Sequence, residues 1–311
     1  MSKPADIICL VLGANGFIGS HLVDELVEAG YKVRAFDRFS QSEPKFKASK
    51  QVEIVAGDIH HRTTLQKSLK NVDYVFHCFS ATTPYSSDND PFSDIDNNLK
   101  PSVTIFQECV AAKVKKIMYM SSGGAVYGDL GGSRAITEED VPAPVSPYGI
   151  TKLGIEGYLA YFKRKFDMPY IAYRLSNPYG PRQAFRNNQG VVPAFISQIK
   201  EGKALNVYGD GNASRDYIFI RDATKMIVKS FIKDNQRPVY NIGSGKQTTL
   251  NDIISHLRTI MKEDVSVELQ EAPKTFLKNT SISIDLFEQE FGRHPMTDLK
   301  SGLEQTLNHK A

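Results

Sequence analysis

The chain has 311 residues, 41% of them hydrophobic, so it is long enough to bury one large core or two adjoining ones. Its 38 Lys and Arg residues nearly balance its 35 Asp and Glu residues, and a net charge of +3 is too small for an electrostatic footprint on nucleic acid. The three cysteines are scattered and no apolar run is long enough to span a bilayer, so we expect a cytoplasmic protein with small-molecule partners and no membrane partner.

The first half of the chain alternates short apolar runs with longer amphipathic stretches. After a run at 7–12 and a helix-like stretch at 17–29, strand-like runs follow at 31–36, 52–56, 74–78, 117–120 and 170–175. Because parallel strands need crossover connections, this pattern predicts an α/β fold with a Rossmann-like, doubly wound parallel sheet. Gly-, Pro- and Asn-rich segments punctuate the rest, which is typical of a smaller lobe. We expect a dinucleotide-binding domain at 1–176, with 218–262 partly returning to it, and a substrate-binding lobe at 177–311.

A glycine series joins the first predicted strand to the first predicted helix. In this context Gly13 permits a tight turn, Gly16 lets the main chain approach a pyrophosphate, and Gly19 lets helix and strand pack closely. The N–H groups of the first helical turn, which includes Phe17 and Ile18, favour an anion. The strand, loop and helix together favour a cofactor site over a glycine-rich turn that binds nothing.

An acidic residue ends the second predicted strand. Asp37 follows the glycine loop by about twenty residues, where a carboxylate can accept both ribose hydroxyls of an adenosine. The neighbouring Arg38 could instead pair with a 2′-phosphate, but Asp37 would repel that phosphate at close range. The sequence therefore predicts NAD as the cofactor.

A second group of polar residues lies near the middle of the chain. Tyr148 and Lys152 are four residues apart on a predicted helix at 148–166, and so share one face. A free tyrosine has a pKa of about 10, so a tyrosine base needs positive charge, which Lys152 and an oxidised nicotinamide ring can supply. Ser121 and Ser122 end the preceding strand, where a crevice forms in parallel sheets. We assign the catalytic hydroxyl to Ser122, with Ser121 as the alternative.

These motifs resemble the extended short-chain dehydrogenases/reductases, the NAD-dependent epimerase/dehydratase family, over nearly the whole chain. The resemblance implies further cofactor contacts from Asp58, Ile59, Phe79, Ser80, Ala81, Asn98 and Ser121. It implies nucleotide-sugar contacts, with a UDP-sugar as the expected substrate, from Asn177, Val191, Val192, Asn206, Val207, Tyr208 and Arg215. Arg215 is the phosphate candidate, since its fork of donors can pair with two oxygens. Relatives often place a further arginine where this chain has Ala272, so Lys274 or Lys278 is expected to replace it.

The family carries out several reactions, so the site must decide among them. Dehydratases that this chain resembles carry an Asp-Glu pair after the strand-end hydroxyl and decarboxylases carry a Glu, whereas this chain has Gly123, Gly124 and Ala125. Gly123 also stands where typical sugar 4-epimerases have the catalytic hydroxyl. The remaining residues suit a reversible redox cycle through a transient ketosugar, which predicts a 4-epimerase of a UDP-hexose or UDP-N-acetylhexosamine. The alternatives are a nucleotide-sugar reductase or dehydrogenase, and a catalytically silent NAD-binding sensor.

Two expectations concern other partners. The resemblance implies a homodimer formed through helices that include residues 94–112 and 148–166. We expect no metal site, because the adjacent His60 and His61 lack further ligands at metal spacing.

Overall fold

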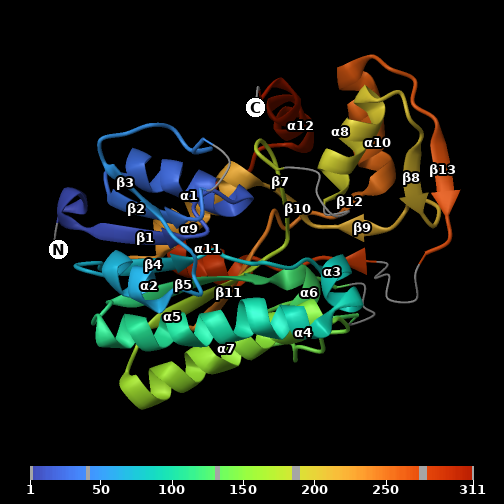
Figure 1. The fold of residues 1–311 in the computed structure, drawn as a ribbon. Helices are drawn as coiled ribbons and strands as arrows, with labels where there is room; N and C mark the ends of the chain where they lie inside the picture. Colours follow the sequence, from blue (N-terminus) through green and yellow to red (C-terminus); the bar gives the residue numbers. More distant parts are fainter. Residues whose placement is uncertain (1–2, 40–42, 130–133, 184–189, 273–278, 310–311) are drawn as a thin grey trace.

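A parallel sheet forms the centre of the protein, in a computed structural model that describes residues 3–39, 43–129, 134–183, 190–272 and 279–309. Its strands are β1 (Ile8–Leu12), β2 (Lys32–Asp37), β3 (Val52–Ala56), β4 (Tyr74–His77), β5 (Lys116–Ser122), β6 (Tyr170–Leu175) and β11 (Val239–Ile242). All pair in parallel, in the order β11-β6-β5-β4-β1-β2-β3 (Figure 1). The strand order reverses between β1 and β4, which is where doubly wound sheets bind ligands. The predicted Rossmann-like fold is confirmed.

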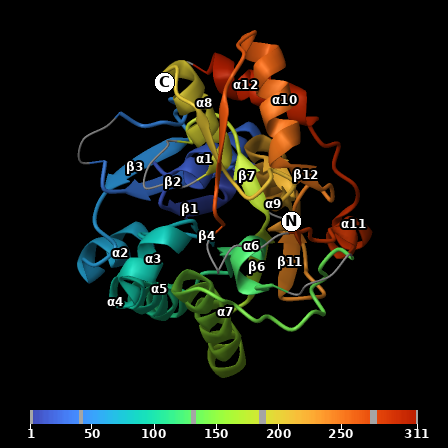
Figure 2. The same cartoon turned by 90° about the vertical axis from the view of Figure 1, so that its right-hand side faces the viewer.

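Helices cover both faces of this sheet. One face carries α1 (Phe17–Glu28), α9 (Ile220–Ser230) and α11 (Asp285–Phe291), and the other carries α2 (Arg62–Ser68), α5 (Lys100–Ala111) and α7 (Pro147–Phe166), as Figures 1 and 2 show. In β1, Cys9 and Val11 pack toward the first set, whereas Leu10 and Leu12 pack toward the second. Because successive side chains of a strand point to opposite faces, a strand buried on both sides is apolar throughout.

The predicted helix at 94–112 is interrupted in the structure. It begins with α4 (Pro91–Asp94), continues as a π-helical turn at Ile95–Leu99, and becomes regular in α5. Pro101 lies in the first turn of α5 and has no N–H to bond the carbonyl four residues back, so the regular ladder cannot run through this point. The irregular turn buries Asn98, which is 5% exposed.

Several further elements are short. They are a 3-10 turn at Pro4–Asp6 before β1, α3 (Pro84–Asn89), α6 (Gly123–Val126), β7 (Asn177–Tyr179), β9 (Ser214–Arg215), β10 (Tyr217–Phe219), β12 (Thr248–Thr249) and β14 (Asn279–Thr280). The pairs are β10 with β7, β12 with β9 and β14 with β9. None is longer than six residues, so tertiary contacts must hold them in place.

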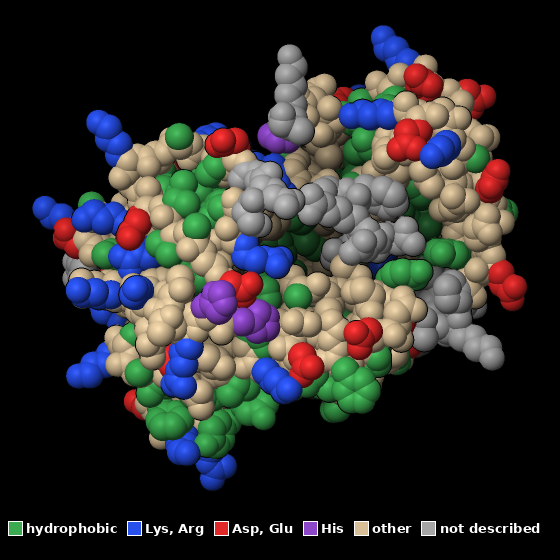
Figure 3. Space-filling view, in the orientation of Figure 1, with side chains coloured by type: hydrophobic (Ala, Val, Ile, Leu, Met, Phe, Trp, Pro, Cys, Tyr) green, Lys and Arg blue, Asp and Glu red, His purple; other side chains and the backbone are tan. Residues whose placement is uncertain are grey.

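A second lobe has a core of its own. It contains α8 (Val191–Lys200), β8 (Leu205–Tyr208), α10 (Leu250–Met261), β13 (Val267–Gln270) and α12 (Leu299–Asn308). Side chains such as Phe195, Val207 and Leu257 are buried there together. In the space-filling view of Figure 3 the surface is hollowed between this lobe and the sheet half. Of the described helices, none is long and apolar enough to cross a membrane.

Candidate functional site

The glycine loop brings the ends of β1 and β4 into contact. Gly13 has a φ of +81°, and a Cβ added there would lie 2.9 Å from the Phe79 amide nitrogen. A Cβ on Gly19 would lie 2.0 Å from the Gly13 carbonyl oxygen, so α1 can pack against the turn after β1 only with glycine at this position. The N–H groups in the first turn of α1 have no carbonyl partner within the helix, so they can bind an anion such as a diphosphate.

Asp37 is held against this loop at the end of β2. Its Oδ2 accepts a hydrogen bond from the Asn15 amide at 2.9 Å, and its Oδ1 accepts one from the Arg38 amide at 2.7 Å. The Asp37 side chain is half-buried and Arg38 is exposed. A fixed carboxylate beside a glycine cradle fits the adenosine half of NAD.

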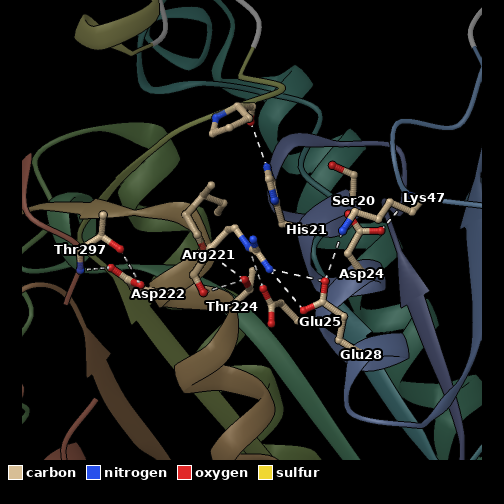
Figure 4. A network of polar contacts seen from close by, with 12 residues as sticks. Ser20, His21, Asp24, Glu25, Glu28, Lys47, Arg221, Asp222, Thr224 and Thr297 are labelled. Atoms are coloured by element: carbon tan, nitrogen blue, oxygen red, sulfur yellow. Dashed lines mark hydrogen bonds and ion pairs between the residues drawn. The ribbon is translucent and has the colours of Figure 1, made fainter. Parts of the chain in front are cut away.

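Helix α1, which begins at the glycine loop, is tied to later parts of the chain (Figure 4). Arg221 on α9 donates to Glu25 at 3.1 Å and to Glu28 at 3.2 Å. His21 Nε2 lies 3.0 Å from the Pro181 carbonyl oxygen, at the end of the β7 loop. Burial lowers the pKa of His21 to about 4, although the Pro181 carbonyl opposes this shift, so this ring is neutral near pH 7. The cofactor helix and the β7 loop are therefore held together.

The start of α7 places the predicted Tyr-Lys pair at the end of β5. The Ser146 side chain accepts a hydrogen bond from the Gly149 amide at 3.2 Å and caps the helix, with Tyr148 in the first turn. One turn later, Lys152 is buried and its Nζ donates to the Met120 carbonyl at 3.0 Å. The same Nζ lies 5.5 Å from the centre of the Tyr148 ring. The structure thus brings the two residues together.

The environment of this pair shifts both pKa values. Burial lowers the pKa of Lys152 to about 8, while the negative charge of Asp94 opposes that shift. Burial, and then Asp94, raise the pKa of Tyr148, and a hydrogen bond with the Ser80 side chain opposes this. Tyr148 therefore needs nearby positive charge to ionise near neutral pH.

The two candidate serines have different surroundings. The Ser121 hydroxyl donates to Glu156 Oε1 at 2.5 Å, and Glu156 Oε2 accepts from Arg174 Nη2 at 2.7 Å within a buried ion pair. Ser122 is half-buried, and no residue in the described ranges forms a hydrogen bond with its side chain. The hydroxyl of Ser121 is thus occupied by a structural contact, whereas that of Ser122 is available to a ligand.

The two glycines after these serines differ in the space around them. A Cβ on Gly123 would lie 3.2 Å from the Arg174 carbonyl oxygen and 3.3 Å from that of Leu175. A Cβ on Gly124 would meet only Asn177 Oδ1, at 3.8 Å. A side chain would therefore fit poorly at Gly123, whereas the lack of a side chain at Gly124 leaves room beside Asn177.

The other predicted cofactor residues fall into two places. Those that follow β4 are Phe79, Ser80 and Ala81. The Ala81 amide donates to Asn98 Oδ1 at 2.7 Å, so the π-helical turn and this loop meet beside the glycine cradle. Asp58 and Ile59 follow β3 at the sheet edge, where Ile59 is buried in the core and Asp58 Oδ1 accepts from the His60 amide at 2.9 Å.

Two predicted substrate residues lie on short strands beyond the sheet. Asn177 opens β7, and both its amide and its Nδ2 donate to the Asp216 carbonyl at 3.0 Å. Arg215 is half-buried on β9, where its Nη1 donates to the Ser214 carbonyl at 2.9 Å and burial lowers its pKa. The Asp216 carbonyl thus links the two segments.

The remaining substrate candidates lie in the second lobe. Val192 on α8 and Val207 on β8 are buried in the lobe core, so their side chains are not available to a nucleotide. Val191 is half-buried, and Asn206 and Tyr208 are exposed on β8. Lys274 and Lys278 lie outside the described residues.

Sequence reasoning missed several buried polar residues at the site. Glu156 lies one helical turn beyond Lys152, so a second four-residue step in the Tyr-Lys spacing was an available signal. Its partner Arg174 and the buried Asp94 had no such signal, because their contacts join distant parts of the chain. Among the described residues, no group of His, Cys, Asp and Glu could hold a metal ion.

Comparisons with known proteins agree with this site. Residues 9–243 match the model of the NAD dependent epimerase/dehydratase family. The chain belongs to this family. It is 32% identical to a putative UDP-glucose 4-epimerase of Methanocaldococcus jannaschii, over 96% of this chain and 97% of the relative. It is 27% identical to a dTDP-4-dehydro-6-deoxyglucose reductase of Escherichia coli, over 96% of both chains. The solved UDP-glucose 4-epimerase of Thermotoga maritima with UDP-glucose superimposes with a TM-score of 0.90 at 30% identity, over 97% of each chain.

Family membership makes the protein an enzyme with NAD as its cofactor. The residues present fit that cofactor: the glycine cradle is open where Cβ atoms would fill it, and Asp37 is fixed beside it. Its relatives act on nucleotide-linked sugars but differ in reaction, as the epimerases and the reductase show.

Proposed function

We propose that this enzyme is a nucleotide-sugar 4-epimerase that acts on a UDP-hexose or UDP-N-acetylhexosamine through a transient 4-keto intermediate. The observation that carries the proposal is the position of Tyr148 and Lys152 at the end of β5, with Gly123 and Gly124 where elimination would need an acid. Without such an acid the pair supports proton transfer at one carbinol, and that suffices for epimerisation.

In this mechanism the residues of the chain position the sugar and move one proton. The phenolate form of Tyr148, which the Lys152 ammonium stabilises, takes the proton of the sugar 4-hydroxyl, and the resulting phenol returns that proton after the centre has inverted. Ser122 donates a hydrogen bond to the same sugar oxygen. NAD, when bound at the glycine cradle, supplies hydride acceptance and donation. Its contacts come from the predicted set that includes Gly16, Asp37 and Asn98.

The substrate side of the site is assigned to the segments beyond β6. Asn177 lies beside Gly124 and is assigned to the sugar diphosphate. Arg215 can pair with two phosphate oxygens, because its guanidinium presents several donors in one plane. Val192 and Val207 contribute main-chain atoms only, since their side chains are in the lobe core.

A second candidate is a nucleotide-sugar reductase or dehydrogenase, which the reductase of Escherichia coli among the relatives favours. That enzyme would use the same tyrosine and lysine but would exchange its cofactor at each turnover. The two functions differ in stoichiometry, because an epimerase regenerates its bound cofactor within one cycle.

The deciding experiment follows UDP-glucose, UDP-galactose and their N-acetyl forms by NMR with the purified protein and no added cofactor. Interconversion of a C4 pair, together with NAD recovered from the denatured protein, is the expected result. Production of one NADH per sugar, seen only when NAD is added, would favour the reductase or dehydrogenase. A protein that binds NAD but converts none of the sugars and produces no NADH would point to the silent sensor.

The proposal includes a homodimer. Exposed apolar side chains lie on α4, the π-helical turn and α7, which pack against one another: Phe92 is 78% exposed, Ile95 39%, Ile150 58%, Tyr158 41% and Tyr161 47%. Pairing of this face with that of a second copy would cover them. Light scattering during size-exclusion chromatography is expected to give twice the chain mass of 34.7 kDa, and a monomer mass would reject the dimer.

A further inference from the structure

A buried carboxylate with no role in the proposed mechanism lies behind the catalytic pair. Asp94, the last residue of α4, is 0% exposed. Its Oδ1 accepts hydrogen bonds from Asn98 Nδ2, at 2.7 Å, and from the Thr82 hydroxyl. Asn98 Oδ1 in turn accepts from the Ala81 amide at 2.7 Å. Asp94 therefore anchors the loop that follows β4 to the π-helical turn.

The second oxygen of this carboxylate is buried without a partner. In the described part of the chain, nothing donates a hydrogen bond to Asp94 Oδ2. An unpaired buried charge is costly, so a nearby cation must compensate for it. The titratable groups that interact with it are Tyr148 and Lys152 on α7 and Tyr119 on β5. Glu156, Cys78 and His77 interact with Lys152 in turn.

Lys152 is the cationic group of this set. Its Nζ lies 5.0 Å from the centre of the Tyr119 ring and 5.5 Å from that of the Tyr148 ring, between β5 and the first turn of α7. Glu156 already has Arg174 as its buried partner. The Lys152 ammonium is therefore the group that can compensate for the negative charge of Asp94.

The direction of the pKa shifts agrees with this arrangement. Burial lowers the pKa of Lys152, and Asp94 is the strongest influence in the opposite direction. Burial raises the pKa of Tyr148, and Asp94 raises it further. A negative charge at Asp94 therefore favours the protonated form of both residues.

We propose that Asp94 is a positioning residue of the catalytic pair: its buried carboxylate, held by Thr82 and Asn98, fixes the β4 loop beside Tyr148 and keeps Lys152 charged. The effect on turnover rests on the proposed function, whereas the charge of Lys152 can be measured without any substrate.

The test replaces Asp94 by Asn, which keeps the acceptor for Thr82 and Asn98 and removes the charge. In protein labelled with ¹³C-lysine, the Lys152 signal is identified by its absence in Lys152→Gln. We expect Lys152 to titrate about one pH unit lower in Asp94→Asn than in the wild type. If the enzyme turns over, both limbs of its pH profile of kcat/KM shift to lower pH, because the pKa values of Tyr148 and Lys152 both fall.

Two further variants make the result decisive. Asp96→Asn is the matched control, because Asp96 is exposed and pairs with Lys100 at 2.6 Å on the surface, and its titration and profile should equal those of the wild type. Thr82→Val keeps the carboxylate of Asp94 but removes one of its hydrogen-bond donors. The negative charge is then less compensated and acts more strongly on Lys152, so the pKa of Lys152 should rise.

An unchanged Lys152 titration in Asp94→Asn would overturn the proposal. If Asp94→Asn does not fold, an unchanged titration in Thr82→Val would overturn it equally. Wild-type protein that converts no sugar would reject the proposed function alone, since the titration of Lys152 does not depend on turnover.

Discussion

The sheet half and the second lobe hold their site residues in different ways. Lys152 and Asn98 are buried and hydrogen bonded to the main chain at the end of β5 and just after β4, in the seven-stranded sheet. Outside the sheet half, Asn206 and Tyr208 are exposed on a two-stranded sheet of the lobe, and Arg215 lies on a strand of two residues. Groups that move a proton need fixed geometry, whereas groups that select a substrate can vary without disturbing a core. We therefore expect substitutions in the sheet half to change kcat and those in the lobe to change KM.

The largest effect is expected for Tyr148→Phe, which removes one hydroxyl from the sheet half. Turnover should fall on the order of 10³- to 10⁴-fold, because the proton acceptor is lost while the ring still packs at the start of α7. The measurement is kcat for the UDP-sugar that the wild type converts, together with the unfolding midpoint in urea.

Tyr158→Phe provides the matched control on the same helix. Tyr158 is 41% exposed in the single chain and lies on the proposed dimer face, away from the reacting groups, so loss of its hydroxyl should leave kcat unchanged. A Tyr148→Phe enzyme that retains a tenth or more of the wild-type kcat would show that another group accepts the proton.

The next largest effect distinguishes Ser122 from its neighbour Ser121 in the sheet half. Ser122→Ala should lower kcat about 100-fold without loss of stability, since this hydroxyl is assigned to the substrate. Ser121→Ala should lower the free energy of unfolding by about 1–2 kcal/mol, because Glu156 loses a buried donor, and should change kcat less. Urea unfolding and steady-state kinetics on both variants test this pair. Full turnover in Ser122→Ala would show that Ser122 does not supply the catalytic hydroxyl.

The same division explains what could be predicted from sequence. Strands buried on both faces are apolar throughout, and Gly13 and Gly19 are required by main-chain geometry, so the sheet and the cofactor loop were recognisable. The pair of Glu156 with Arg174 and the contacts of Asp94 depend on tertiary packing and leave no local pattern.

The lobe was harder to predict for a related reason. Val207 was assigned to the substrate by resemblance, yet its side chain is in the lobe core, because alternate residues of β8 face inward.

In the sheet half, the interruption of the helix at 94–112 was also missed, although Pro101 was visible in the sequence. A proline in a first turn does not by itself reveal that a π-helical turn precedes it.

The smallest effect is expected outside the sheet half, for Arg215→Lys. A lysine keeps the positive charge but cannot pair with two phosphate oxygens at once, so KM for the UDP-sugar should rise about tenfold while kcat stays near that of the wild type. Inhibition by UDP should weaken by the same factor, because UDP carries the diphosphate without the sugar. Arg293→Lys is the control, since that side chain is 89% exposed and has only a surface pairing with Glu288. A fall in kcat with unchanged KM in Arg215→Lys would place this arginine with the reacting groups. It would contradict the expectation that only substitutions in the sheet half change kcat.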